Sequence, residues 1–266
     1  MTFWNIYLRI FGRPAWAGFH TALLKFALRG LGFQNWWSPR VSGEAWVLEQ
    51  VGATFKAPCL VDVGANVGTY ATLARRLIPQ ARIISLEPNP ASHTVLALAA
   101  SEHGFTAIHT AAGSGRGTAS LYFRADQPTS THASLLAEVN GADETTQVKV
   151  PLTTLDALLP TLGVEHVHLL KVDVEGAELE VLTGASATIA AGAVDWVQFE
   201  FNTMNIAART YFDDFSRALP GYRFFRLLPR GLVEIDGSTW SLPNLFVYQN
   251  LLAVRPGAPL PRPFRN

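Results

Sequence analysis

Cysteine is almost absent from this chain of 266 residues, which contains only Cys59. A single cysteine cannot form a disulfide within the chain, and Cys59 stands directly before an apolar run. We expect it to be buried as a small apolar side chain in a protein of a reducing compartment. A nucleophilic role for its thiol is not favoured.

An excess of charge of either sign is also missing, because 21 Lys and Arg residues are balanced by 21 Asp and Glu residues. Proteins that bind nucleic acids generally carry a basic excess that neutralises phosphates, so this balance argues against a nucleic-acid partner. A small or neutral molecule is the expected partner. The length suits one large α/β domain with a small appendage better than two full domains.

The first 50 residues lack a long apolar run. Arg9 and Arg13 interrupt the apolar residues, and no small-residue cleavage site follows, so we recognise no secretory signal. The longest charge-free stretch there, from Pro14 to Leu24, is shorter than the roughly 20 residues that cross a bilayer. We therefore expect a cytoplasmic protein without a transmembrane helix.

The same segment is rich in aromatic and basic residues, with five Lys and Arg against two Asp and Glu over residues 1–50. From Trp16 onward, apolar residues recur at the spacing of one helix face: Phe19, Leu23, Phe26 and Ala27. Such an amphipathic helix can pack on the main domain, cover the substrate or attach to the inner face of a membrane. We favour packing on the main domain, because a small basic excess is common on solvated faces.

Residues 60–70 indicate a buried strand, a glycine turn and the start of a helix. Leu60 to Val63 is an apolar run typical of the middle of a parallel sheet. Gly64 and Gly68 permit a positive φ, and they let a ligand approach the backbone N–H groups at the helix start. The stretch predicts a cradle for a nucleotide-like ligand. A tight strand-to-helix turn without a ligand is the alternative.

An acidic residue follows this turn at the sequence separation that is typical of a ribose-binding residue. Residues 82–87 are predicted to form a second buried strand, which Pro88 ends, and Glu87 lies 23 residues after Gly64. In doubly wound folds, an acidic residue about 20 positions beyond the glycine turn accepts hydrogen bonds from ribose hydroxyls. Predicted strands and helices continue to alternate along the rest of the chain. The helices are predicted at 91–102, 177–189 and 211–219, and the strands at 106–111, 118–123, 147–150, 167–176, 196–202, 223–228 and 244–254.

Polar residues stand where several of these strands end. Ligands of open α/β sheets bind outside the carboxyl ends of the strands. We therefore expect one shared edge to carry six of these residues: Asp62, Glu87, Asp173, Glu175, Glu200 and Asn202. A polar insertion, residues 124–146, contains His132, which is a candidate base or ligand even though solvated loop histidines are more frequent.

The glycine turn fits a nicotinamide fingerprint poorly, since Asn66 and Thr69 occupy the second and third glycine positions. Instead, residues 61–68 (VDVGANVG), followed by Leu86-Glu87-Pro88 and by residues 171–178 (KVDVEGAE), resemble the FkbM family of S-adenosylmethionine-dependent methyltransferases. The resemblance covers roughly residues 40 to 255. The segment 198–202 resembles family members thought to methylate sugars of surface glycans.

The resemblance implies a Rossmann-like, class I methyltransferase sheet of seven mostly parallel strands, with the last strand antiparallel. It implies that the turn formed by Gly64, Ala65, Asn66, Gly68 and Thr69 wraps the methionine part of the cofactor. Glu87 would then hold the ribose, Asp62 would orient the turn or the amino group, and residues from Ala111 would border the adenine. The expected organisation is a helical extension (1–50), the methyltransferase domain (51–255) and a flexible proline-rich tail (256–266).

Methyl transfer needs a hydroxyl oxygen in line with the methyl group, and a base that takes the hydroxyl proton. Our candidates for the base are Asp173, Glu175, Glu200 and His132, although Glu175 could equally serve as a first-turn carboxylate of the next helix. Asp173, Glu200 and Asn202 also offer oxygen ligands for Mg²⁺. We rank a metal site below catalysis by a base alone.

The sequence thus predicts an O-methyltransferase acting on a hydroxyl of a sugar, a glycan or another small molecule. A nucleotide-dependent oxidoreductase or sugar-modifying enzyme on the same sheet is one alternative. A catalytically silent, cofactor-binding scaffold protein is the other.

Overall fold

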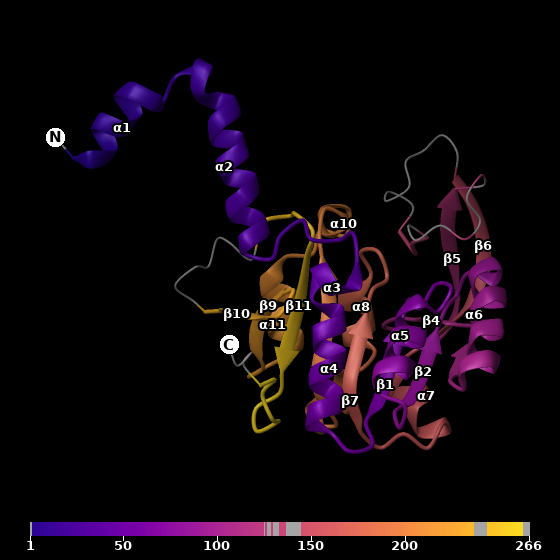
Figure 1. Cartoon of the computed structure of the whole chain (residues 1–266). Coiled ribbons are helices and arrows are strands. Elements are labelled where there is room, and N and C mark those ends of the chain that lie inside the picture. Colours follow the sequence, from indigo (N-terminus) through magenta and orange to yellow (C-terminus); the bar gives the residue numbers. More distant parts are fainter. Residues whose placement is uncertain are drawn as a thin grey trace.

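A mostly parallel sheet of eight strands forms the centre of the computed structural model (Figure 1). The structure describes residues 2–124, 126, 129, 133–136, 145–236 and 244–262. The strands lie in the order β10-β9-β11-β8-β7-β1-β2-β3. Their bounds are β1 Cys59–Val63, β2 Arg82–Leu86, β3 Thr106–Ile108, β7 Val167–Val172, β8 Val194–Phe201, β9 Arg223–Leu228, β10 Gly231–Ile235 and β11 Gln249–Val254.

The expected count of seven strands is wrong by one, because β10 pairs antiparallel with β9 and extends the edge of the sheet. None of its five residues is buried, and Glu234 interrupts its apolar residues, so β10 lacks the apolar run by which the other strands were predicted. The last strand, β11, is antiparallel to both of its neighbours, as expected. It begins at Gln249 rather than at residue 244, since the preceding residues form a turn.

A second, three-stranded sheet lies beside the first and has the order β4-β6-β5. The single strand predicted at 106–111 is divided, so that β3 belongs to the main sheet and β4 to the second sheet. The strands predicted at 118–123 and 147–150 are present and pair antiparallel with each other. The bounds are β4 Ala111–Ala112, β5 Gly117–Arg124 and β6 Thr145–Thr153.

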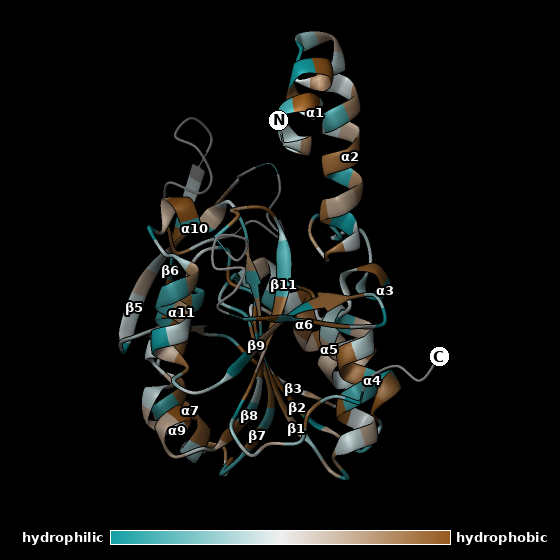
Figure 2. Ribbon diagram, turned by 90° about the vertical axis from the view of Figure 1, so that its left-hand side faces the viewer, coloured by the Kyte–Doolittle hydropathy of each residue, from teal (hydrophilic) through white to brown (hydrophobic). Residues whose placement is uncertain are grey.

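Helices cover both faces of the main sheet (Figure 2). Apolar residues of α4 and α5 form one core cluster with the sheet, and α7, α8, α9 and α11 form the other. Along β1, Leu60 packs in the first cluster, whereas Val61 and Val63 pack in the second, as alternating strand residues must. The helices of the domain are α3 Pro39–Ser42, α4 Glu44–Thr54, α5 Thr69–Leu77, α6 Pro90–His103, α7 Leu155–Thr161, α8 Glu178–Thr183, α9 Ser186–Ala190, α10 Met204–Ala207 and α11 Phe212–Ala218.

The N-terminal helices, α1 (Phe3–Phe11) and α2 (Ala17–Gly30), project away from the domain (Figure 1). None of residues 2–31 is buried, so the expected packing of this segment on the main domain is wrong. Other helices already pack on both faces of the main sheet. The chain enters the domain at Phe33, which is fully buried and forms a bridge with Gln249.

Two smaller expectations concern Cys59 and the tail. Cys59 is a buried free cysteine, as predicted, and burial raises the pKa of its thiol. The described part of the proline-rich tail contacts the domain, because Trp196 Nε1 donates to Pro259 O over 2.9 Å and Gln50 Oε1 accepts from the Arg262 N–H. Among the described residues, no helix is both long and apolar enough to cross a membrane.

Candidate active site

The turn after β1 is held tightly against the neighbouring strands. Gly64 has a φ of 83°, and the N–H groups of Gly64 and Ala65 both donate to Leu86 O over 3.0 Å. A Cβ atom on Gly64 would lie 1.8 Å from Asp173 O. Only glycine therefore lets the ends of β1 and β7 come this close while the chain turns into α5.

Glu87 fastens the same turn from the end of β2. Its Oε2 accepts from the Asn66 N–H over 2.8 Å, and its Oε1 accepts from the Asn89 N–H over 2.7 Å. Asn66 has a φ of 47°, a backbone conformation that is uncommon in residues other than glycine. Burial raises the pKa of Glu87 to about 7, although the two backbone N–H groups oppose the shift.

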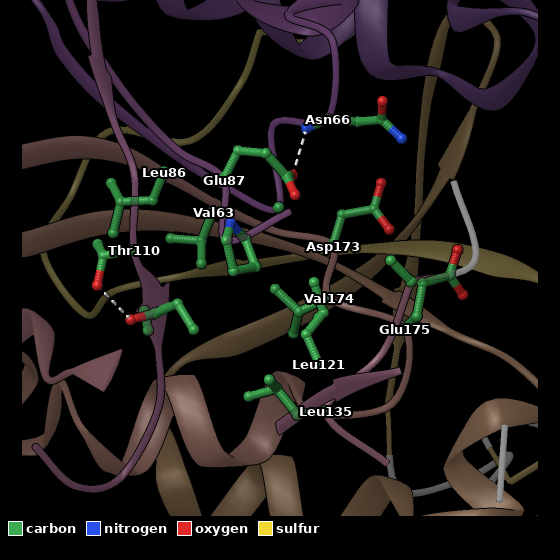
Figure 3. A pocket seen from close by; sticks show the side chains of 15 residues that line it. Val63, Asn66, Leu86, Glu87, Thr110, Leu121, Leu135, Asp173, Val174 and Glu175 are labelled. Atoms are coloured by element: carbon green, nitrogen blue, oxygen red, sulfur yellow. Dashed lines mark hydrogen bonds between the residues drawn. The ribbon is translucent and has the colours of Figure 1, made fainter. Parts of the chain in front are cut away.

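A pocket opens where β1, β2 and β7 end, with about 510 Å³ of empty space including its mouth (Figure 3). Polar side chains line one side of it, whereas the second sheet and the insertion between β5 and β6 close the other side with an apolar wall. That wall consists of Ala111, Ala112, Leu121, Ala133 and Leu135.

The charged side chains that line the pocket are all acidic. Glu87, Asp173 and Glu175 all line it, and no Lys, Arg or His occurs among the described residues of its lining. Carboxylates around a partly desolvated cavity favour a cationic ligand and disfavour a ligand that carries phosphates. The pocket therefore suits a positively charged small molecule with an apolar or aromatic portion.

Four of the residues predicted to bind the cofactor line this pocket, namely Gly64, Asn66, Glu87 and Ala111. The other four have positions in the framework around it. Asp62 faces Lys171, Ala65 is buried in the turn, Gly68 packs against Leu96 of α6, and Thr69 borders a separate surface depression. The roles predicted for these residues remain predictions.

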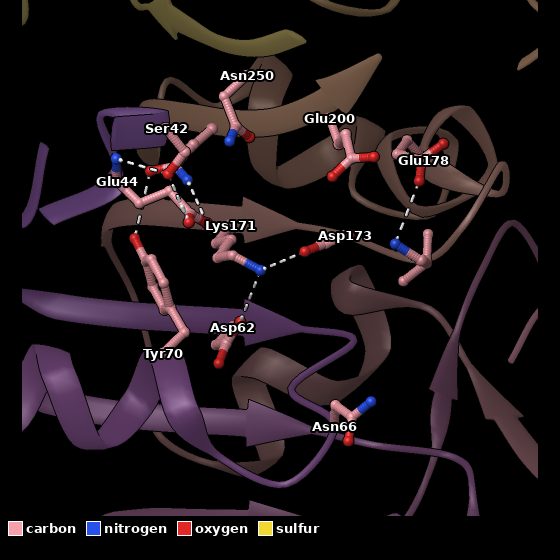
Figure 4. A network of polar contacts seen from close by, with 12 residues as sticks. Ser42, Glu44, Asp62, Asn66, Tyr70, Lys171, Asp173, Glu178, Glu200 and Asn250 are labelled. Carbon is pink, nitrogen blue, oxygen red and sulfur yellow. Dashed lines mark hydrogen bonds and ion pairs between the residues drawn. The ribbon is translucent and has the colours of Figure 1, made fainter. Parts of the chain in front are cut away.

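A buried polar row lies behind the pocket on the face covered by α4 and α5 (Figure 4). Asp62, Lys171 and Gln198 are partners in register on β1, β7 and β8. Lys171 Nζ lies 2.9 Å from Asp173 Oδ2 and 3.7 Å from Asp62 Oδ1. Burial opposes the charge on Lys171, yet Asp173, Asp62 and Glu44 together hold its pKa well above the usual value.

Asp62 is the least satisfied member of the row. Its carboxylate is almost completely buried and accepts no hydrogen bond from the described residues. Burial raises the pKa of Asp62 to about 6, and the nearby ammonium of Lys171 opposes this shift. Asp62 does not belong to the lining of the pocket, and its predicted role toward the turn or the amino group of the cofactor stays a prediction.

The candidate bases are placed differently. Asp173 and Glu175 line the pocket, whereas Glu200 lies outside its lining and accepts a hydrogen bond from the side-chain amide of Asn202. Burial, followed by the charges of Asp173 and Glu175, raises the pKa of Glu200 well above the usual value. His132 lies outside the described residues.

Glu178, which the sequence did not single out, holds the loop between β7 and α8. Its Oε1 accepts from the N–H groups of Val174 and Gly176 over 3.1 Å each. Glu175 precedes the helix with a φ of 54°, so its alternative role as a first-turn carboxylate is wrong, and Glu178 takes that position. Ser134 Oγ also donates to Glu175 O, which ties the insertion to this loop.

The three residues proposed as Mg²⁺ ligands do not form a suitable cation site. Asp173 Oδ2 is paired with the Lys171 ammonium, and Asn202 Oδ1 accepts from the Met204 N–H over 2.6 Å. The Asn202 side chain presents its amide donor, not its oxygen, to Glu200. Mg²⁺ requires free oxygen ligands that converge on one point.

His166, His168 and Asp195 come within metal-ligand spacing at the opposite edge of the sheet. Their ligand atoms are already engaged, since His166 Nε2 and Arg255 Nη2 each contact the Asp195 carboxylate. His168 Nδ1 accepts from the Cys59 N–H, so the neutral ring carries its proton on Nε2. A ring in this state has no lone pair for a metal.

Comparison with known proteins bears on this geometry. Residues 62–224 match the family model described as the methyltransferase FkbM domain. The chain belongs to the FkbM methyltransferase family. It is 34% identical over 157 residues to methyltransferase sdnD of Sordaria araneosa, covering 48% of this chain and 60% of that protein. It is 31% identical over 142 residues to methyltransferase 1 of Beauveria bassiana, covering 47% of this chain and 57% of that protein.

The alignments thus span less than two thirds of each of these curated relatives. Among solved structures, precorrin-6y C5,15-methyltransferase from Geobacter metallireducens covers 79% of this chain and 87% of its own, with 10% identity and a TM-score of 0.42. The match to the family model confirms the predicted family. The observed sheet confirms the class I methyltransferase fold that the family implies. Seven strands, β9-β11-β8-β7-β1-β2-β3, form the expected sheet, to which β10 is added.

Proposed function

We propose that this FkbM protein binds S-adenosylmethionine in the pocket and transfers its methyl group to a hydroxyl of a sugar, a glycan or another small molecule. The charge of the pocket carries the proposal. Glu87, Asp173 and Glu175 would favour a ligand with a sulfonium and an ammonium group, whereas they would repel the pyrophosphate of NAD.

The lining offers a matching surface for each part of this cofactor. Glu87 retains lone pairs for ribose hydroxyls, since each carboxylate oxygen accepts one described N–H group and can accept another donor. Ala111 and Leu135 supply apolar surface suited to an adenine ring. When bound, the cofactor supplies an electrophilic methyl group on a positively charged sulfur.

Asp173 is the base that the geometry favours. Its carboxylate lines the pocket, and Lys171 holds Oδ2, which leaves Oδ1 to accept the proton of the acceptor hydroxyl. Asp173 would accept the proton of the acceptor hydroxyl, while the bound cofactor would supply the methyl group and keep the bonding electrons on its sulfur. Lys171 is then a positioning residue, because it acts through Asp173.

Calorimetric titration with S-adenosylmethionine, S-adenosylhomocysteine and NAD tests the cofactor. We expect binding of the first two and no binding of NAD; binding of NAD alone would overturn the proposal and favour an oxidoreductase. Transfer of labelled methyl groups to a panel of sugars, glycans and small alcohols tests the reaction. Cofactor binding without transfer to any acceptor would favour the silent scaffold.

A metal requirement is tested in the same assay. Because Lys171 is paired with one oxygen of Asp173 and the Met204 N–H donates to Asn202 Oδ1, we expect chelation followed by addition of Mg²⁺ to leave the rate unchanged. Activity that is lost on chelation and restored by Mg²⁺ would contradict catalysis by a base alone.

A further inference from the structure

The projecting N-terminal segment, residues 3–30, exposes large apolar side chains over most of its length. On α1 these are Phe3, Trp4, Ile6, Leu8 and Ile10, and on α2 they are Phe19, Leu23, Leu24 and Phe26. The side chain of Phe26, for example, is 75% exposed. Single exposed apolar residues are normal, but a continuous set of this size marks an interaction surface.

The two helices form a hairpin with a defined geometry. Tyr7 OH donates to His20 Nδ1 over 3.2 Å, and His20 Nε2 donates to Phe11 O over 3.1 Å. The Phe11 ring contacts Trp16 edge-on, with centroids 5.0 Å apart. These contacts hold α1 against the start of α2 while their apolar side chains remain exposed.

The charge of the segment identifies the partner. Residues 1–43 contain five basic residues, Arg9, Arg13, Lys25, Arg29 and Arg40, and no Asp or Glu. Cations beside exposed Trp, Phe and Leu residues match the surface of an anionic lipid bilayer, which takes up apolar side chains and attracts basic ones. A second copy of the same surface would bring like charges together, so self-association is disfavoured.

We propose that the α1–α2 hairpin docks this protein on the surface of a membrane that contains anionic lipids. Because no described helix can span a bilayer, the hairpin would lie in the interfacial layer. The hairpin also leaves the domain at the carboxyl edge of the sheet, since Phe33 is bridged to Gln249 and Gln249 pairs with Phe201 at the end of β8 (Figure 1). Docking would therefore place the edge that carries the pocket toward the lipid.

Co-sedimentation of the full chain with vesicles tests this docking, and it does not depend on the proposed methyl transfer. We expect binding to vesicles of phosphatidylcholine mixed with phosphatidylglycerol, weaker binding to phosphatidylcholine alone, and release by added salt. Trp4→Ser and Phe26→Ser should each weaken binding roughly tenfold. Arg13→Gln and Lys25→Gln should each weaken it about fivefold.

Matched controls carry the same changes elsewhere on the surface. Leu98 of α6 is 69% exposed, so Leu98→Ser removes a comparable apolar group, and Arg116→Gln removes an exposed charge. Neither should change vesicle binding. Thermal unfolding of every variant checks that the domain is intact.

Three results would overturn the proposal. They are no binding to anionic vesicles, equal losses of vesicle binding in the Leu98 and Phe26 variants, or vesicle binding that none of the hairpin substitutions weakens. Sedimentation velocity without lipid examines the competing occupant. A dimer that dissociates on Phe26→Ser, together with no vesicle binding, would assign the surface to a second copy of the chain.

Discussion

The ammonium of Lys171 lies 2.9 Å from Oδ2 of Asp173, and this contact joins the buried polar row of the sheet to the lining of the pocket. The same ammonium lies 3.7 Å from the buried Asp62 carboxylate. One cation thus balances one carboxylate in the core and another at the site. Stability and site geometry are coupled through Lys171.

Replacing Lys171 by methionine should therefore destabilise the fold. The change leaves Asp62 buried without its counter-charge, and loss of one partner of a buried ion pair costs roughly 3–5 kcal/mol. Denaturant unfolding at neutral pH measures the loss, with the exposed Lys149→Met as a control expected near zero. The double variant Asp62→Asn with Lys171→Met should recover part of the stability. Strictly additive losses would contradict a direct coupling between the two residues.

Gly64→Ala should prevent a stable native state or cost more than about 3 kcal/mol. The new Cβ would lie 1.8 Å from Asp173 O at a φ of 83°, so the end of β7 would have to move. Gly115→Ala is the control, since nothing lies within 4 Å of the position that its new methyl group would take and its φ is not in the left-handed range. Urea unfolding of both variants decides the matter. Equal stability would show that the turn can relax.

The sequence predicted the pocket's polar side because that side follows a topological rule. Parallel strands end at one edge, so Glu87 and Asp173 could be placed together without coordinates. Its apolar wall was not predicted. Leu121 belongs to the second sheet and Leu135 to the insertion, and no pattern in the local sequence indicates that these segments pair with each other and border the pocket. The amphipathic pattern of α2 likewise indicates an apolar partner without saying which one, so its exposure could not be foreseen. Glu178 was missed because a carboxylate that binds backbone N–H groups looks like any first-turn acid.

The pH dependence of stability should contain a contribution from Glu178. Burial raises its pKa from 4.5 to about 7, so the native state holds this proton more tightly than the unfolded chain does. The contribution is complete below pH 4.5 and is lost as the pH rises to about 7, by up to about 3 kcal/mol. Glu178→Gln, which cannot ionise, should remove this slope. Unfolding free energies measured from pH 4 to 8 in both proteins would contradict the assignment if their difference stayed constant.

Two of the four candidate bases, Asp173 and Glu200, should respond differently to neutralisation. Asp173→Asn removes the group that faces the pocket, so we expect the methyl-transfer rate to fall roughly 10²- to 10⁴-fold. Burial and the charges of Asp173 and Glu175 raise the pKa of Glu200 well above the usual value, and its side chain lies outside the lining of the pocket, so Glu200→Gln should change the rate little. Single-turnover rates with saturating cofactor make the comparison, and cofactor affinity is measured alongside. A larger loss in the Glu200 variant would exchange the two roles.

Binding of S-adenosylmethionine should release protons near neutral pH. In the free protein the pKa of Glu87 is raised to about 7 by burial, so a substantial fraction of its carboxyl groups is protonated there. A cationic ligand whose hydroxyls donate to this group favours the ionised form and lowers its pKa, which requires the proton to leave. Affinity should therefore fall as the pH drops below 7, by up to about tenfold per pH unit. Calorimetry in buffers of different ionisation enthalpy counts the released protons. Glu87→Gln should bind more weakly at pH 8 and lose the pH dependence, whereas an unchanged proton count would place the titrating group elsewhere in the pocket.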